Sequence, residues 1–430
     1  MTDARDVPVD PTSFERLAEQ ELTYRLIDTA SDADTEAFLR ADARGFLDRE
    51  PTDEQIIADR PHLRDRRNVG VFEKGAQQGD FPVATVNAWE TPLTVPGGEI
   101  EMWAISSVTV AGTHRRRGIA RNLLEGELRA AASAGFAMAG LTVSEATIYG
   151  RYGFASAIPV AHFRIDTRRA GWAGGDPLGR LEYLDKHELK QQLAVLHQAV
   201  RRHRSGQVAG WERRWEQQAG LNPGDPTASA VRGIAFRDEA GVMRGVMSYK
   251  LEEIPGAFRY RMAITHLIAT TPEARRGLWG FALQHDLVTE ITADLRPLDD
   301  PLPWLVRDRR GIVITAHDHG WLRILDVPAA LAARSYRAPL DVVLRVNDPL
   351  GFGAGTWRIV VSDGVATAEP APDAEPDGLI DIGSLSAIYA GGVTATQLRA
   401  AGRLDAPLEI AASLDDAFRA IEAPVLSIWY

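Results

Sequence analysis

The stretch of sequence that decides the fold is Val108 to Ala120, which reads Val-Thr-Val-Ala-Gly-Thr-His-Arg-Arg-Arg-Gly-Ile-Ala. The β-branched residues at its start predict the end of a strand. The Arg-x-x-Gly-x-Ala run after a short loop predicts the start of a helix. The first amides of a helix have no partner inside it and lie at the positive end of its dipole, which suits a pyrophosphate. The segment therefore predicts a phosphate cradle.

The residue types in this segment suit close contact with a coenzyme. Small residues at 118 and 120 let phosphates approach the backbone, and guanidinium groups can form forked bonds to phosphate oxygens. An extended pantetheine arm can pair with the preceding strand like an added strand. The Walker and Rossmann patterns are absent, and the alternative is a strand–helix junction with a solvated arginine run. We expect the coenzyme to contact Val108, Thr109, Val110, Arg115, Arg116, Arg117, Gly118, Ile119, Ala120 and Ser144.

The sequence on either side of the cradle predicts a mixed α/β layer. A helix is expected from about Arg117 to Ala132, and Phe136 to Val143 is an apolar run of buried-strand length. Upstream, the patterns predict strands over 22–27, 68–73, 81–89 and 101–110 and a helix capped by Ser31 or Asp32. This order of elements favours the α/β (α+β) class, with helices flanking a mixed sheet.

Beyond residue 165 the chain repeats itself and then changes character. The stretch 172–180 is rich in glycine and proline and marks a boundary. A hairpin over 234–250, a strand over 259–268 and a helix opened by Arg275-Arg276-Gly277 then repeat the first pattern. Short strands follow over 340–346, 357–361 and 365–369, with helices over 382–390 and 395–401. We expect three domains, at 1–165, 166–310 and 311–430.

Composition excludes several classes of function. The 430 residues include no cysteine, which removes disulfides, thiolate metal sites and a cysteine nucleophile, and the ten scattered histidines indicate no metal site. A formal charge of −11 argues against nucleic acid as a partner. No run approaches the roughly 18–20 apolar residues that cross a bilayer, and the polar first twenty residues do not resemble a secretory signal. We expect a cytoplasmic protein.

A second motif lies downstream of the cradle. Ile148-Tyr149-Gly150-Arg151-Tyr152-Gly153-Phe154 follows the apolar run 136–143. A phenol at Tyr149 could protonate a departing coenzyme-A thiolate, as general acid catalysis requires. The alternative is an aromatic packing residue in a tight turn.

Together these motifs resemble the GNAT superfamily of N-acetyltransferases, and within it the enhanced intracellular survival (Eis) family. Eis-like proteins share the Val-x-Val-Ala-x-Thr-His-Arg-Arg-Arg-Gly segment, the Ile-Tyr-Gly-Arg-x-Gly turn and a late run. Here that run is Trp321 to Leu331, Trp-Leu-Arg-Ile-Leu-Asp-Val-Pro-Ala-Ala-Leu. The resemblance covers nearly the whole chain.

The resemblance implies an acetyl-coenzyme A site in the first domain, a degenerate second GNAT-like domain and a C-terminal domain like a sterol carrier protein. It implies a homohexamer that acetylates amines of aminoglycosides, polyamine-like compounds or lysine-containing acceptors. Tyr149 matches the general acid, and the carboxylate of Tyr430 matches the base. The apolar segment 424–430 favours a docked terminus. Acidic and aromatic walls for a cationic acceptor are expected at Asp48, Glu50 and Trp89.

Two expectations concern the repeat and the alternatives. Superposing Gly277 on Gly118 places Trp279 where the first copy has Ala120, and Ala274 where it has Arg115. The second copy is therefore expected to bind no acetyl-coenzyme A and to form a wall of the acceptor site. The alternative functions are a catalytically silent lipid- or coenzyme-A-binding protein and an acetyltransferase acting on protein lysines.

Overall fold

The computed structural model describes residues 3–256 and 258–430, which form two compact units. The first unit contains the chain up to Ala157, the segment 320–419 and Tyr430. The second contains the described residues of 158–319 and the segment 420–429. In the part of the chain that is described, no helix is both long enough and apolar enough to cross a membrane. The first compact unit therefore contains most of the N-terminal third and most of the C-terminal third of the chain. The division into three domains at 1–165, 166–310 and 311–430 remains our proposal.

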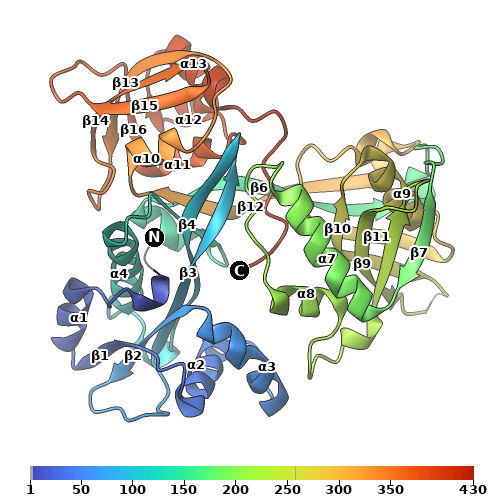
Figure 1. The fold of residues 1–430 in the computed structure, drawn as a ribbon, viewed down its shortest axis with the longest axis horizontal. Coiled ribbons are helices and arrows are strands. Elements are labelled where there is room, and N and C mark those ends of the chain that lie inside the picture. The colour runs from blue at the N-terminus through green and yellow to red at the C-terminus, as the bar shows by residue number, and fades with distance from the viewer. Residues whose placement is uncertain (1–2, 257) are drawn as a thin grey trace. The chain divides into compact units, whose positions relative to one another are not determined.

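The first unit is built on a sheet of strand order β1-β2-β3-β4-β5-β12 (Figure 1). Its strands pair antiparallel except β4 with β5, which are parallel because α4 crosses between them. The strands are β1 (Leu22–Leu26), β2 (Arg67–Glu73), β3 (Ala84–Val95), β4 (Gly98–Val110), β5 (Met138–Thr142) and the Gly320–Ile324 part of β12 (Ile312–Ile324).

Helices cover both faces of this sheet. Figure 1 shows α1 and α4 on one face and α2 and α3 on the other. The inner face of α4 follows the predicted stripe, and Ile119, Leu123, Leu124 and Leu128 are all buried. Each such side chain stabilises the layer by about 2 kcal/mol. The helices are α1 (Pro11–Ala18), α2 (Asp32–Gly45), α3 (Asp53–Arg64), α4 (Ile119–Ser133) and the short α5 (Ala146–Tyr149).

Strands β4 and β5 separate before β4 ends. Their pairing runs from Met102 opposite Met138 to Ile105 opposite Leu141. Beyond Ile105, β4 continues to Val110 while β5 pairs with β12 up to Thr142 opposite Gly320. On the other side of β4, a bulge sets Val86 of β3 against both Ser107 and Val108. The edge of β4 from Ser106 to Val110 therefore faces a gap rather than a neighbouring strand.

The C-terminal part of the first unit is a separate small α+β layer. Its sheet has the order β15-β14-β13-β16-β17. Arg323 of β12 and Asp348, both fully buried, join this layer to the first through two short hydrogen bonds of 2.7 and 2.8 Å. Its elements are α10 (Val327–Ala332), β13 (Leu340–Asn347), β14 (Gly355–Ser362), β15 (Val365–Pro370), β16 (Gly378–Asp381), α11 (Ile382–Tyr389), α12 (Ala395–Ala400), β17 (Leu404–Asp405) and α13 (Leu408–Phe418).

The second unit repeats the plan of the first, as the sequence predicts. Its sheet has the order β6-β11-β10-β9-β8-β7, and only β10 and β11 are parallel, with α9 between them. The elements are β6 (Ala155–Asp166), α6 (Thr167–Ala170), β7 (Arg180–Leu184), α7 (Lys186–Arg201), α8 (Glu212–Ala219), β8 (Val231–Arg237), β9 (Met243–Glu253), β10 (Tyr260–Ala269), α9 (Pro272–Leu283) and β11 (Val288–Arg296).

The predicted alignment of Gly277 with Gly118 is wrong. Gly118 precedes α4 as its N-cap, whereas Gly277 is the sixth residue of α9 and packs on Phe236. Trp279 is buried in the core of the second unit and packs beside Phe163, so its indole does not stand in a cradle. The similar Arg-Arg-Gly tripeptides misled the comparison, because the helix in the second copy begins six residues earlier relative to them.

Candidate active site

A single cleft of about 1120 Å³ in the first unit contains most of the predicted coenzyme residues. It lies where β4 separates from β5 and where α4 begins. Gly45 and Phe46 of the α2 end and Pro349 and Leu350 of the C-terminal layer also contribute to its wall. The predicted residues that line it are Val108, Thr109, Val110, Arg115, Arg116, Gly118, Ile119, Ala120, Ser144 and Tyr149.

The start of α4 is open at the cleft. Gly118 adopts φ 73°, a left-handed conformation that glycine accepts without strain, and it has no side chain to cap the helix. A Cβ atom built on Gly118 would have no neighbour within 4 Å. The first residues of α4 line the cleft, as an anion site at a helix start requires.

The three arginines of the loop before α4 differ in whether they line the cleft. Arg115 and Arg116 line the cleft, and Arg116 itself has a left-handed φ of 63°. Arg117 does not line the cleft, because its guanidinium donates a 3.0 Å hydrogen bond to the carbonyl oxygen of Gln20. Two of the three loop arginines thus lie at the cleft beside the helix start.

Tyr149 closes the cleft from the β5 side. Its residue is only 7% exposed, its ring contacts Phe154 edge-on, and burial raises the pKa of its phenol, with Glu145 and Tyr152 adding to the shift. The phenol is therefore protonated at neutral pH and is able to donate. The turn that follows is fixed by Arg323, whose Nε donates 2.8 Å to the carbonyl oxygen of Tyr152 and leaves no room for a side chain at Gly153.

Tyr430 is held at the end of β5. The hydroxyl of Thr142 donates to the backbone oxygen of Tyr430, and the amide of Tyr430 lies 3.4 Å from the same hydroxyl. The ring of Tyr430 meets Trp89 edge-on at 5.3 Å, and the guanidinium of Arg66 lies 3.6 Å above the Trp89 ring. Burial raises the pKa of the Tyr430 phenol, so this group also stays neutral.

The predicted acceptor residues take different positions. Trp89 lies beside Tyr430, as described above. Glu50 instead pairs with Arg40 at 2.8 Å in an exposed ion-pair cluster, and Asp48 is an exposed residue just after α2. Sequence reasoning missed Asp42 of α2, which follows Phe38 and Ala41 on the buried stripe of that helix. A carboxylate at position i+4 of an apolar stripe was the available signal.

These features fit acetyl-coenzyme A as the donor. The open helix start and two arginines suit its pyrophosphate, and the unpaired edge of β4 offers backbone groups to an extended arm. Tyr149 belongs to α5, which follows β5, and the backbone oxygen of Tyr430 contacts Thr142 at the end of β5. The chemistry of this arrangement is group transfer at the far end of the arm.

Among its described residues, the second unit lacks an equivalent cradle. Eight residues separate β4 from α4, whereas only Thr270 and Thr271 separate β10 from α9. The Thr271 hydroxyl caps the amide of Ala274, and Pro272 has no N–H to offer. The recess at this helix start, about 420 Å³, also has Glu422 in its wall, which disfavours an anion.

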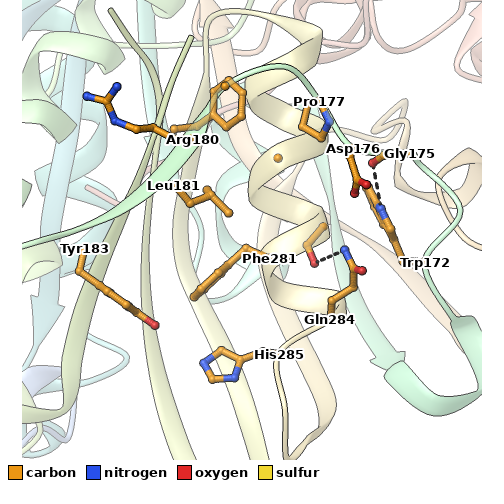
Figure 2. Close-up of a pocket in the computed structure, with 14 residues that line it drawn as sticks. Trp172, Gly175, Asp176, Pro177, Arg180, Leu181, Tyr183, Phe281, Gln284 and His285 are labelled. Atoms are coloured by element: carbon orange, nitrogen blue, oxygen red, sulfur yellow. Dashed lines mark hydrogen bonds between the residues drawn. The ribbon is translucent and has the colours of Figure 1, made fainter. Parts of the chain in front are cut away.

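Another cleft in the second unit is different in kind. Figure 2 shows it along the middle and C-terminal part of α9, with Trp172, Tyr183, Phe281 and His285 around it. Its volume is about 470 Å³. Since it does not include the start of α9, it is not a second copy of the phosphate cradle.

Comparison with known proteins agrees with this description of fold and site. Models of the acetyltransferase (GNAT) domain match residues 26–157 and 206–324, and a model of the sterol carrier protein domain matches residues 327–427. The fold and site thus define an acyltransferase of the GNAT class, with a sterol-carrier-like domain after two GNAT domains.

The relatives specify the family. An uncharacterized N-acetyltransferase of Streptomyces avermitilis is 35% identical over 400 residues, 90% of this chain and 94% of its own length. N-acetyltransferase Eis of Mycobacterium tuberculosis is 32% identical over 349 residues, 78% of this chain and 82% of its own. The crystal structure of Eis1 from Mycobacterium abscessus superposes with a TM-score of 0.80 at 28% identity, covering 95% of this chain and all of that one. The chain belongs to the Eis-like N-acetyltransferases.

Proposed function

We propose that this N-acetyltransferase transfers the acetyl group of acetyl-coenzyme A directly to a primary amine, with Tyr149 as general acid and the carboxylate of Tyr430 as base. The observation that carries the proposal is the convergence of three features in the first unit. They are the open start of α4, the unpaired edge of β4 and the buried phenol of Tyr149.

The direction of the donor follows from these features. A pyrophosphate at Gly118 leaves the arm to run back along β4 from Val110 towards Val108. The bulge at Ser107 and Val108 frees a backbone amide there from the regular ladder, and such an amide polarises the thioester oxygen. The acetyl group then lies at the end of the cleft away from the phosphates.

Tyr149 supplies a proton to the sulfur. Because burial raises the pKa of its phenol, Tyr149 is protonated at neutral pH and can donate its proton to the sulfur as the carbon–sulfur bond breaks. Replacing Tyr149 with phenylalanine keeps the packing on Phe154 and removes only the hydroxyl. We expect Tyr149→Phe to lower kcat by about 100-fold or more, with little change in the affinity for acetyl-coenzyme A. Unchanged turnover would exclude Tyr149 from the mechanism.

The acceptor is proposed to be a cationic amine of the aminoglycoside, polyamine or lysine type. The net charge of −11 and the aromatic pair Trp89 and Tyr430 suit such a substrate. Asp48, Glu50 and Trp89 are the proposed acceptor-side residues, and a hexamer is the proposed assembly, as the family resemblance implies. An acetyltransferase of protein lysines would use the same chemistry with a wider acceptor groove.

The test is a turnover assay with acetyl-coenzyme A across aminoglycosides, polyamines and lysine peptides. Thiol release is measured, and the products are identified by mass. Acetylated product from at least one class supports the proposal. Binding of acetyl-coenzyme A without thiol release in the presence of any acceptor would instead support a silent coenzyme-A-binding protein. In a parallel calorimetric titration we expect one acetyl-coenzyme A per chain, because the start of α9 is already capped.

A further inference from the structure

A carboxyl group with one shielded oxygen atom lies near the cleft and has no role in the mechanism described so far. It belongs to Asp42, near the end of α2. Its Oδ1 atom is shielded from solvent and has no hydrogen-bond partner among residues 3–256 and 258–430. A buried carboxyl oxygen without a partner costs free energy, and proteins rarely retain one without a use for it.

The packing of α2 on β4 places this carboxyl group relative to the donor. A Cβ atom on Gly45 would lie 2.3 Å from the Cβ of Thr109, so the helix rests directly on the strand, and both residues line the cleft. Asp42 is one helical turn before Gly45, and its carboxyl group lies close enough to the Ser107 side chain for that group to lower its pKa. Ser107 is two residues before Thr109. Going from Thr109 to Ser107 leads away from the phosphate cradle at Gly118. The carboxyl group therefore lies beyond the end of the extended arm where the acetyl group belongs.

A polar and aromatic network surrounds Asp42 on that side. Asn87 donates from Nδ2 to the Ser107 hydroxyl at 3.2 Å, and its Oδ1 accepts from Arg66 at 3.4 Å. The guanidinium of Arg66 stacks on Trp89, and Trp89 contacts Tyr430. Ser107 has a left-handed φ of 54°, a strained conformation for serine, at the bulge of β4. Strain and a buried polar network next to a cleft indicate a functional position.

We propose that Asp42 receives the ammonium group of the acceptor and takes the first proton from it, a role that rests on the function proposed above. The unpartnered Oδ1 atom is the hydrogen-bond acceptor for that ammonium group. Trp89 and Tyr430 form the aromatic side of the same subsite. The ligand class is a primary alkyl ammonium.

The acidity of Asp42 suits this role better than that of an ordinary carboxylate. Burial raises the pKa of Asp42 to about 7, and the charge of Asp48 adds to the shift, whereas Ser107 and Arg66 oppose it. Asp65 acts on Arg66 in turn. An alkyl ammonium has a pKa of about 10.4, so transfer of its proton to Asp42 is unfavourable by about 10³-fold. Transfer to a carboxylate with the usual terminal pKa of about 3.3 would be unfavourable by about 10⁷-fold.

The two carboxylates then divide the protons of the nitrogen between them. Asp42 takes one proton from the ammonium group, and the free amine forms a bond to the acetyl carbon. The nitrogen, now positively charged and strongly acidic, loses a second proton, for which the weaker base at Tyr430 suffices. The carbon–sulfur bond breaks, Tyr149 protonates the sulfur, and the proton at Tyr430 returns to Tyr149. Asp42 releases its proton to solvent, so the net products are an amide, a thiol and one proton.

The test is the dependence of kcat/KM on pH for a polyamine acceptor in the full-length protein. In the wild type we expect kcat/KM to rise up to about pH 7, where Asp42 ionises, and then to level off. In Asp42→Asn we expect kcat/KM at pH 7 to fall by about 100-fold or more. It should continue to rise about tenfold per pH unit towards pH 9, because only the free amine can then react. Asp42→Glu should restore part of the activity.

Two controls make the outcomes distinct. Calorimetric affinity for acetyl-coenzyme A should stay within about twofold in Asp42→Asn, which shows that the cradle is intact. Asp32→Asn changes an exposed aspartate at the start of the same helix that pairs with Arg60, and it should leave the profile unchanged. A wild-type profile in Asp42→Asn would overturn the role of Asp42. Absence of acetylated product in the wild type would contradict the proposed function itself.

Discussion

The hydroxyl of Thr142 donates a hydrogen bond to the backbone oxygen of Tyr430, so the last residue of β5 fixes the position of the residue at 430. The contact joins residues 288 positions apart, and the bonded hydroxyl lies where β4 and β5 have already separated. A residue held in this way is a positioned group rather than part of a frayed segment.

The Thr142 contact is tested by removing the hydroxyl alone. Thr142→Val keeps the shape of the side chain, and loss of a hydrogen bond to a charged group weakens positioning by about 1.5–3 kcal/mol. We expect kcat to fall roughly 10- to 100-fold, with unchanged affinity for acetyl-coenzyme A. Thr142→Ser, which retains the hydroxyl, should keep most of the turnover. Equal rates in the valine and serine variants would show that the contact is not needed.

The phosphate cradle is tested with two glycines of one helix. Gly118 and Gly135 precede and follow α4, with φ of 73° and 86°, and a Cβ atom on either would meet nothing within 4 Å. Alanine at each position should therefore lower the stability by a similar 1–2 kcal/mol or so. Only Gly118→Ala should weaken acetyl-coenzyme A binding, by roughly tenfold or more in a calorimetric titration. Similar affinities in both variants would place the phosphates elsewhere.

Much of this arrangement could be predicted from the sequence, because local chemistry decides it. The cradle segment contains its own strand end, glycine and helix start, and α4 and β5 follow as expected. The hydrogen bond from Arg323 to the carbonyl oxygen of Tyr152 could not be predicted from the sequence, since it joins residues 171 positions apart. The direction of Arg117 towards Gln20 depends likewise on a distant backbone carbonyl.

Other differences arose where two local signals conflicted. Helix α3 was not predicted, although Thr52 and Gln55 form a capping box at its start; it contains Pro61, a residue that usually ends a helix. Asp42 was passed over because its neighbours on the buried stripe predict an apolar position. Its importance became visible only when Ser107 and Arg66, from two other elements, were placed around it.

The tail of the second unit should respond to acid through His319. The Nε2 atom of this buried histidine lies 3.0 Å from the carbonyl oxygen of Ile428, and its ring meets Trp429 edge-on at 4.5 Å. Burial lowers the pKa of His319 to about 4, below its usual value of 6.5. The stability that comes from the neutral ring is thus fully present above pH 6.5 and is lost as the pH falls from 6.5 through about 4.

Digestion of the C-terminal segment measures this effect. We expect an acid-tolerant carboxypeptidase to release residues 425–430 faster at pH 5 than at pH 7, relative to an unstructured peptide of the same sequence. In His319→Gln, which has no proton to gain, the relative rate should not depend on pH. A pH-independent rate in the wild type would contradict the role assigned to His319.

Asp42 should also lower the stability of the fold at alkaline pH. Because its pKa is raised from 3.8 to about 7 in the folded protein, the protonated form fits the fold better than the ionised form. Its contribution is most favourable below about pH 4 and is lost as the pH rises through about 7. This rise of about 3 in the pKa corresponds to about 4 kcal/mol of lost stability at pH 8.5.

The variant Asp42→Asn removes this charge. Although the variant should lose activity, it is therefore expected to raise the melting temperature at pH 8.5 more than at pH 5. Thermal unfolding of both proteins at the two pH values measures the difference. If Asp42→Asn raised the melting temperature equally at both pH values, the carboxyl group would not be buried in the folded protein.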